Sequence, residues 1–121
     1  MANKKTLVLG ATPNPDRYAY LAATRLKAKG HEIVNVGIKK GEVAGVQIEQ
    51  PTKIYTDIDT ITLYVGPNNQ SDLYQYILDT NPKRIVFNPG TENSELENLA
   101  SARGIETIEA CTLVMLATNQ Y

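Results

Sequence analysis

The sequence predicts an α/β fold, built as a single doubly wound parallel sheet of about five strands with helices on both faces. Two observations lead to this prediction. Short apolar runs alternate along the chain with segments of helical spacing, which is the order expected of βαβ units. The apolar runs are continuous, as is typical of strands buried on both faces. The 121 residues suit one compact domain, so we assign 1–121 to a single domain.

The expected strands are apolar runs that stop near glycine, proline or asparagine. Five main strands cover residues 6–10, 33–36, 61–65, 84–87 and 105–108. Residues 37–45 are polar and glycine-rich and predict a loop, and a short edge strand is expected at 46–48.

Four helices are expected between and after these strands. The first covers about 16–29, with Asn14 as N-cap and Pro15 in the first helical position. The second covers about 71–79. The third opens at a capping box formed by Ser94 and Glu97, and the last is a short apolar helix at 111–118 that we expect to dock on the sheet or to cover a dimer contact. Apolar spacing assigns these residues to inward faces: Tyr18, Leu21, Ala22, Leu26, Leu96, Leu99 and Ala100.

The segment 7–17 says most about function. An apolar run stops at Gly10, a short turn of small, polar and proline residues follows, and then a helix begins. This order aims unpaired backbone N–H groups and the positive end of a helix dipole at one point, which suits the phosphates of a nucleotide. In a doubly wound sheet, ligands bind beyond the carboxyl ends of the strands where the strand order reverses. The loops 10–17, 37–40, 65–69 and 88–93 are expected to meet there.

The first loop departs from the dinucleotide-binding fingerprint. Thr12 and Pro15 stand where G-x-G-x-x-G has its second and third glycines, and the acidic residue expected about 20 positions later is missing. Lys39 and Lys40 follow the second strand and favour a phosphorylated ribose over a free diol.

Residues 10–17, Gly-Ala-Thr-Pro-Asn-Pro-Asp-Arg, resemble the opening Gly-Ala-Ser-x-x-Pro-x-Arg of small CoA-binding proteins with a Rossmann-like domain. The same domain opens the α subunit of succinyl-CoA synthetase. Thr12 keeps the hydroxyl of the family's serine. The end of the chain is similar too, with a strand that runs into Asn-Pro-Gly at 88–90 and a last strand that leads to Cys111, where the family often has a cysteine.

Two segments depart from the family pattern. Many relatives follow the third strand with Phe-Arg-Arg-Pro, where this chain has Val-Gly-Pro at 65–67, so an arginine that could face phosphate is absent. The second strand of relatives usually ends in Val-Asn-Pro, where this chain continues into Lys39 and Lys40. These lysines are candidates to replace the lost charge.

The resemblance implies CoA or an acyl-CoA as cofactor. The pyrophosphate would lie over the loop 10–17, where Thr12 could donate its hydroxyl and Arg17 could supply charge. The adenosine would rest near 37–40 and against 65–67, and the pantetheine arm would run along 88–90. The expected cofactor-binding residues are Gly10, Ala11, Thr12, Asn14, Arg17, Tyr18, Gly37, Lys39, Lys40, Val65, Gly66, Pro67, Asn88, Pro89 and Gly90.

We assign no catalytic residue and no metal ligand. His31, the single histidine, is expected at the surface, and Cys111 is expected to be a buried structural thiol. With one histidine and one cysteine, no zinc site of ordinary ligand spacing can be assembled. Asp57 and Asp59 are expected to face solvent, and Tyr64, Tyr74 and Tyr76 to lie in the core or an interface.

These observations favour a stand-alone protein that binds CoA or acyl-CoA without catalytic machinery of its own, acting as a homodimer or beside a partner enzyme. Two alternatives stay open: a small NADP-binding module or reductase with Lys39 and Lys40 on the 2′-phosphate, and a protein-interaction module that has lost its nucleotide ligand. A net charge of -1 gives no reason to expect nucleic acid or a membrane surface as partner. The single cysteine and the lack of a signal-peptide pattern indicate a cytoplasmic protein.

Overall fold

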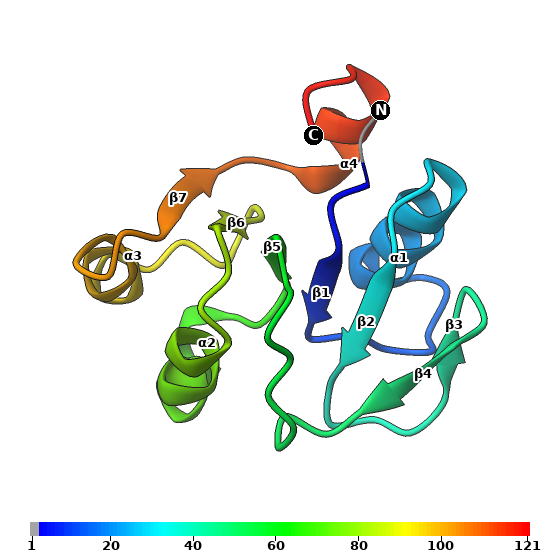
Figure 1. The fold of residues 1–121 in the computed structure, drawn as a ribbon. Coiled ribbons are helices and arrows are strands. Elements are labelled where there is room, and N and C mark those ends of the chain that lie inside the picture. The colour runs from blue at the N-terminus through cyan, green and yellow to red at the C-terminus, as the bar shows by residue number, and fades with distance from the viewer. Residues whose placement is uncertain (1–2) are drawn as a thin grey trace.

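The computed structural model describes residues 3–121, which form one seven-stranded sheet (Figure 1). The strand order is β3-β4-β2-β1-β5-β6-β7. The strands are β1 (Thr6–Leu9), β2 (Ile33–Val36), β3 (Glu42–Val43), β4 (Val46–Glu49), β5 (Thr60–Leu63), β6 (Arg84–Phe87) and β7 (Glu106–Glu109). All neighbouring strands are parallel except the pair β3–β4. The predicted α/β class is confirmed, with seven strands in place of about five.

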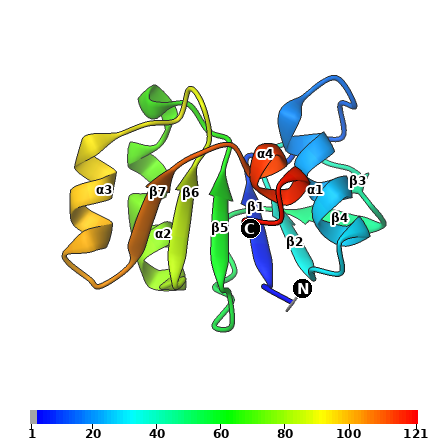
Figure 2. The same ribbon diagram turned by 90° about the horizontal axis from the view of Figure 1, so that it is seen from above.

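Helices cover both faces of this sheet (Figure 2). They are α1 (Tyr18–Ala28), α2 (Tyr74–Thr80), α3 (Ser94–Ser101) and α4 (Thr112–Ala117), with two 3-10 turns, η1 (Pro67–Asn69) and η2 (Ser71–Leu73), before α2. Alternate residues of β1 point to different layers. Leu7 and Leu9 join the cluster under α2 and α3, whereas Val8 joins the cluster under α1 and α4.

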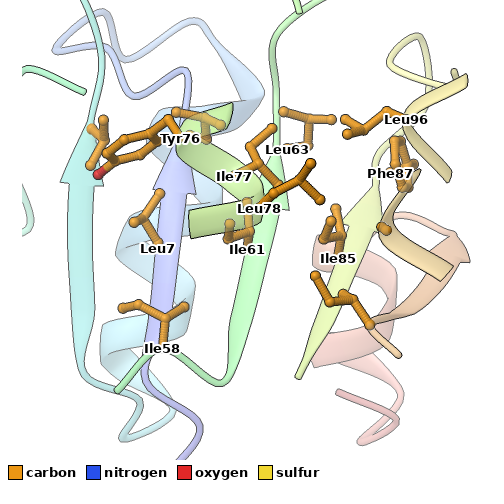
Figure 3. Packing of buried hydrophobic residues seen from close by; sticks show 14 of the residues in the cluster. Leu7, Ile58, Ile61, Leu63, Tyr76, Ile77, Leu78, Ile85, Phe87 and Leu96 are labelled. Carbon is orange, nitrogen blue, oxygen red and sulfur yellow. The ribbon is translucent and has the colours of Figure 1, made fainter. Parts of the chain in front are cut away.

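The cluster under α2 and α3 shows why the apolar runs are continuous (Figure 3). Leu7, Ile61 and Ile85 stand side by side in register on β1, β5 and β6, and Ile77 of α2 belongs to the same cluster. All four side chains are fully buried. Burial of each such side chain stabilises the fold by about 1.5–3 kcal/mol. This cluster packs one face of the sheet centre, and the cluster under α1 and α4 packs the other face.

The segment 37–45, expected to be a loop, contains β3. Ala44 and Gly45 both have positive φ, of 54° and 77°, as a two-residue hairpin turn requires. The buried side-chain amide of Asn35 donates hydrogen bonds to the carbonyls of Val43 and Val46 and holds this hairpin against β2. The expected edge strand at 46–48 forms as β4, but it pairs with both β2 and β3, so β3 is the edge.

The predicted start of the first helix is wrong. Arg17, not Asn14, is the N-cap of α1, and the Asn14 side chain instead accepts a hydrogen bond from the amide of Asp16 in the turn before the helix. The buried face consists of Ala19, Ala22, Ala23 and Leu26. Tyr18 is 72% exposed and Leu21 is also exposed, because small alanine side chains let α1 approach the sheet closely and leave the larger ones outside.

The third helix also begins differently from the prediction. Asn93 is the N-cap of α3, and its side-chain oxygen accepts hydrogen bonds from the amides of Glu95 and Leu96. Ser94 is therefore the first helical residue, and the predicted capping box is not the N-cap. Leu96 and Ala100 are buried as expected, but Leu99 is exposed.

The predicted surface position of His31 is wrong, because the end of the chain folds back over it. His31 is only 2% exposed. Its Nδ1 accepts a hydrogen bond from the Lys4 amide at 2.9 Å, and its ring lies edge-on to the Tyr121 ring. Met115, Leu116 and Tyr121 join the cluster on this face of the sheet, which confirms that the terminal helix docks there.

Three other expectations concern Asp57, Asp59 and Cys111. Asp57 is exposed and pairs with Lys5 at 2.9 Å. Asp59 does not simply face solvent: it is half-buried and accepts a hydrogen bond from the Thr60 hydroxyl. Cys111 is only half-buried, at the N-cap of α4, because the chain there leaves β7 and crosses the end of the sheet.

Candidate functional site

A cleft of about 960 Å³ lies at the carboxyl ends of the central strands. Its walls are the segments that follow β1, β2, β5 and β6, together with Pro51 after β4. The strand order reverses between β1 and β5, so the cleft lies at the switch point where such sheets place ligands. Of the residues expected to bind a cofactor, those that line it are Gly10, Ala11, Thr12, Asn14, Arg17, Tyr18, Gly37, Lys39, Val65, Gly66, Pro89 and Gly90.

The backbone amides of the first loop are not all available to a ligand. Those of Gly10 and Ala11 both donate to the Val36 carbonyl, at 2.9 and 3.0 Å. Within residues 3–121, the amides of Thr12, Tyr18 and Ala19 have no hydrogen-bond partner. The expected unpaired amides are present, but Gly10 and Ala11 do not supply them. The available donors are at Thr12 and in the first turn of α1.

Gly37 serves the contact between two loops of the protein. A Cβ atom added at this position would lie 2.4 Å from the Ala11 carbonyl oxygen, well inside van der Waals contact. Glycine at position 37 thus lets the segment after β2 approach the segment after β1. Gly66 is different, because no described residue other than its two chain neighbours lies within 4 Å of a Cβ added there.

Two cationic side chains belong to the cleft. Arg17, at the N-cap of α1, and Lys39, after β2, are both exposed and form no ion pair with any residue in the described range. The acidic side chains of Asp16 and Asp72 also line the cleft. An anion is therefore favoured on the side of Arg17 and of the α1 dipole.

Gln70 joins the segment after β5 to the segment after β6, and these two segments form the wall of the cleft that faces the start of α1. Its side-chain amide donates to the carbonyls of Val65 and Thr91, both at 2.8 Å, and its oxygen accepts a hydrogen bond from Asn93 at 2.9 Å. The side chain is fully buried. It ties the segment after β5 to the segment after β6, so it positions the cleft without lining it.

Lys40, Pro67 and Asn88 were expected to bind the cofactor but do not line the cleft. Asn88 is 1% exposed and its side chain is bonded within the protein. Its amide donates to the Thr62 hydroxyl and the Leu63 carbonyl, and its oxygen accepts from the Thr112 amide. Asn88 therefore links β6 to β5 and to the start of α4.

A second pocket of about 240 Å³ adjoins the cleft. Tyr18, Tyr64 and Pro89 belong to both cavities, and Asn88, Cys111 and Leu113 complete the small one. Tyr64 packs against the cluster under α1 and α4, as expected of a core residue, and it also forms part of both walls.

Sequence reasoning missed several residues of the cleft. Asp72 and Leu73 come from the turns after β5, beyond the expected loop 65–69. Asn69 and Thr91 lie within the expected loops 65–69 and 88–93 but were not named as binding residues. The rule that the carboxyl ends of parallel strands share one edge could have found all four. Pro51 could not be found in this way, because the parallel pairing of β4 with β2 has no signal in the local pattern.

No helix in the range 3–121 has the length and apolar character needed to cross a membrane. No group of three or more histidine, cysteine, aspartate or glutamate residues in that range is arranged to hold a metal ion.

The fold and the cleft together define a Rossmann-like α/β domain with a ligand site at the switch point of its sheet. A family profile described as the CoA binding domain matches residues 4–117. The chain therefore belongs to the CoA-binding domain family. No curated protein is similar enough to the chain to count as a match.

Several solved structures share the fold of this chain. A crystal structure described as that of an uncharacterized protein is 55% identical, with a TM-score of 0.97 and 100% of both chains covered. A conserved hypothetical protein from Pyrococcus furiosus is 25% identical, with a TM-score of 0.80 over 92% of this chain and 97% of that one. A Thermus thermophilus protein is 20% identical, with a TM-score of 0.84 over 98% and 91%, and shares the fold.

Proposed function

We propose that this protein binds CoA or an acyl-CoA in the cleft at the switch point and that it acts as a stand-alone binding protein without catalytic groups of its own. The observation that carries the proposal is the start of α1. There, the unpaired amides of Thr12, Tyr18 and Ala19 and the guanidinium of Arg17 belong to one wall of the cleft. Membership in the CoA-binding domain family supports CoA as the anion that this wall receives.

The ligand's phosphates have distinct partners in this proposal. The pyrophosphate lies against Thr12, Arg17 and the first turn of α1. The Thr12 hydroxyl oxygen accepts a hydrogen bond from the Asn14 amide at 3.2 Å, which leaves its hydrogen to donate. Lys39 faces the 3′-phosphate of the ribose, the adenosine rests against Val65 and Gly66, and the pantetheine arm runs along Pro89 and Gly90.

We propose that the cleft binds its ligand and does not itself catalyse a reaction. Its walls contain carboxylates at Asp16 and Asp72 but neither histidine nor cysteine among the described residues. We assign none of these side chains a catalytic role. The protein then carries or senses CoA and passes it to a partner. The partner is an enzyme or a second copy of this chain.

Calorimetric titration with CoA, dephospho-CoA, NADP and NAD tests this proposal. Arg17→Ala should weaken CoA binding about ten- to a hundredfold, because a charge-assisted contact with phosphate contributes about 1.5–3 kcal/mol. Arg25→Ala is the matched control, since Arg25 lies in the last turn of the same helix and does not line the cleft. Lys39→Ala should reduce the preference for CoA over dephospho-CoA.

Two results would replace the proposal. Binding of NADP without binding of CoA would favour an NADP-binding module, with Lys39 on the 2′-phosphate. Absence of binding to all four compounds would favour a protein-interaction module that keeps the fold without the ligand. Equal losses in the Arg17 and Arg25 variants would move the phosphate site away from the start of α1.

A further inference from the structure

The face of the sheet that α1 and α4 cover carries several exposed apolar side chains. Tyr18 and Leu21 on α1 are exposed, and Val114 on α4 is 58% exposed. Ile108 of β7 is also exposed and points to this face, because its register partner on β6 is Val86, which belongs to the cluster under α1 and α4. Figure 2 shows α4 between α1 and β7 on this surface, which we call the α4 face. Exposed apolar side chains gathered on one face mark a site of contact with another protein.

Two contacts show which side of α1 belongs to the α4 face. The Lys27 ammonium donates to the Ala44 carbonyl, so one side of the helix lies against the β3–β4 hairpin. Tyr18 lies on the other side, where it lines the small pocket together with Leu113 of α4. Arg25 follows Tyr18 by about two helical turns and therefore lies on the same side of α1 as Tyr18.

Charge is distributed unevenly across the α4 face. The helix α1 contains Arg25 and Lys27 and no acidic residue, and α4 contains no charged residue. Beyond α4, the strand β7 contains Glu106 and Glu109 and no basic residue. Glu106 lies on the α4 face, because it is two residues before Ile108 and every second residue of a strand points to the same side. The α4 face is therefore basic along α1, uncharged in the middle and acidic along β7.

Arg25 and Glu106 have no oppositely charged partner among the described residues. Both are exposed, and neither forms an ion pair within the range 3–121. Arg84 is the register partner of Glu106 on β6, but its guanidinium donates to the Thr60 hydroxyl and the Tyr121 carbonyl. Both charges are therefore available to a partner molecule.

We propose that the α4 face binds a second copy of this chain about a two-fold axis that runs along α4. Rotation about this axis exchanges the two sides of the face, so the basic side of one copy contacts the acidic side of the other. The Val114 side chains of the two copies pack together near the axis. A two-fold axis across α4 would instead place α1 against α1 and bring like charges together. This inference does not depend on the proposed binding of CoA.

The heights of the two charges along the sheet agree with this arrangement. Glu106 is the first residue of β7 and is level with the first residue of β2 through the registers of the parallel strands. Arg25 lies in the last turn of α1, at the end of the helix that leads to β2. Arg25 and Glu106 thus lie at the same end of the sheet, so an axis along α4 brings Arg25 of one copy to Glu106 of the other.

Sedimentation velocity on the full chain tests the inference between about 1 and about 200 µM, a range in which a micromolar dimer dissociates on dilution. The unmodified protein should be dimeric at the upper end of this range. Val114→Glu should weaken association at least about thirtyfold, because two carboxylates would then be buried close together near the axis. Leu99→Glu is the matched control, since Leu99 is also exposed but lies on α3, which covers the other face of the sheet. It should leave association unchanged.

A charge reversal tests the orientation of the two copies. Arg25→Glu should weaken association about tenfold, because two equivalent ion pairs are replaced by repulsion. Adding Glu106→Arg to Arg25→Glu should restore association, since the pairs then form with their charges exchanged. Lys53→Glu is the matched control for the single reversal. The Lys53 carbonyl accepts from the Tyr76 hydroxyl of α2, so Lys53 lies on the other face of the sheet.

A protein that stays monomeric at every concentration would overturn the inference and leave the α4 face to a different partner. Equal weakening by Val114→Glu and Leu99→Glu would place the interface elsewhere. A double variant that associates no better than Arg25→Glu alone would overturn the pairing of α1 with β7. Circular dichroism spectra should be the same for all variants, because every substituted side chain is exposed. Loss of CoA binding has no bearing on these outcomes.

Discussion

Gly37 and Gly66 both line the cleft, but only Gly37 is required by the packing of the protein. Gly37→Ala should lower the free energy of unfolding by about 1–3 kcal/mol, because the new Cβ would be 2.4 Å from the Ala11 oxygen and both loops must shift. Gly66→Ala should raise it by about 0.4–1 kcal/mol, because the backbone there has φ -63° and the alanine loses less entropy on folding. Urea denaturation monitored by circular dichroism measures both changes.

The same Gly66→Ala variant reports on ligand approach. If the adenosine of CoA rests against this backbone, the added methyl group should weaken CoA binding while the free protein becomes more stable. Unchanged affinity in a stabilised variant would mean that the ligand does not approach the backbone at position 66.

His31 makes the stability of the protein depend on pH. Burial, followed by the nearby charge of Lys4, lowers its pKa below 6.5 in the folded state. Its contribution is therefore fully present above about pH 6.5 and is lost as the pH falls from 6.5 through the lower folded pKa. Protonation at Nδ1 would also break the hydrogen bond from the Lys4 amide. The free energy of unfolding should fall between pH 7.5 and pH 5.5.

His31→Gln is the control for this pH dependence, because glutamine keeps a hydrogen-bond acceptor and does not titrate. Urea denaturation at several pH values should give a flatter profile for the variant than for the unmodified protein. Profiles of equal slope would assign the pH dependence to another group.

At the scale of elements, Gln70 connects the turns after β5 to the segment after β6. Gln70→Ala should lower the free energy of unfolding by about 3 kcal/mol, because three hydrogen bonds are lost and the carbonyls of Val65 and Thr91 are left without this donor. Gln75→Ala is the matched control. Gln75 is exposed on α2, and among the described residues its side chain bonds only to Asp79, so its loss should change the free energy by less than about 0.5 kcal/mol. Equal losses would show that Gln70 is not a structural link.

Elements whose signal is local were predictable from the sequence, and elements that depend on pairing were not. The apolar runs of β1, β2, β5 and β6 mark strands wherever they lie in the sheet. The strand β3 has only two residues, too few to show a pattern. Its position is set by the turn at Ala44–Gly45 and by Asn35, a buried side chain on a different strand.

The candidate site also has a part that the sequence predicts and a part that it does not. The parallel-sheet rule predicted which loops meet, and they do line one cleft. Other features of the site depend on contacts between segments far apart in sequence. The Val36 carbonyl accepts from the amides of Gly10 and Ala11, Gln70 bonds to Thr91, and Asn88 bonds to Thr112. No local pattern contains such contacts.

At the scale of the whole molecule, ligand binding should be visible as added stability. CoA at 100 times its dissociation constant should raise the free energy of unfolding by about 2.7 kcal/mol, since a ligand that binds only the folded state draws the equilibrium toward it. Urea denaturation with and without CoA measures the effect. Arg17→Ala should show a much smaller increase at the same CoA concentration, and an undiminished increase would contradict the role given to Arg17.

The carbonyl of Val36 receives two amides from the first loop, and this has a consequence for redesign. Introducing a glycine in place of Thr12 would not convert the domain to a nicotinamide-dinucleotide binder. The amides of Gly10 and Ala11 cannot turn toward a diphosphate, because both donate to the Val36 carbonyl at the end of β2. Gly37 lets the segment after β2 lie directly against Ala11. A change of cofactor would require redesign of the loop after β1 and the loop after β2 together. Cofactor preference in this fold therefore depends on two loops and not on the sequence of the first loop alone.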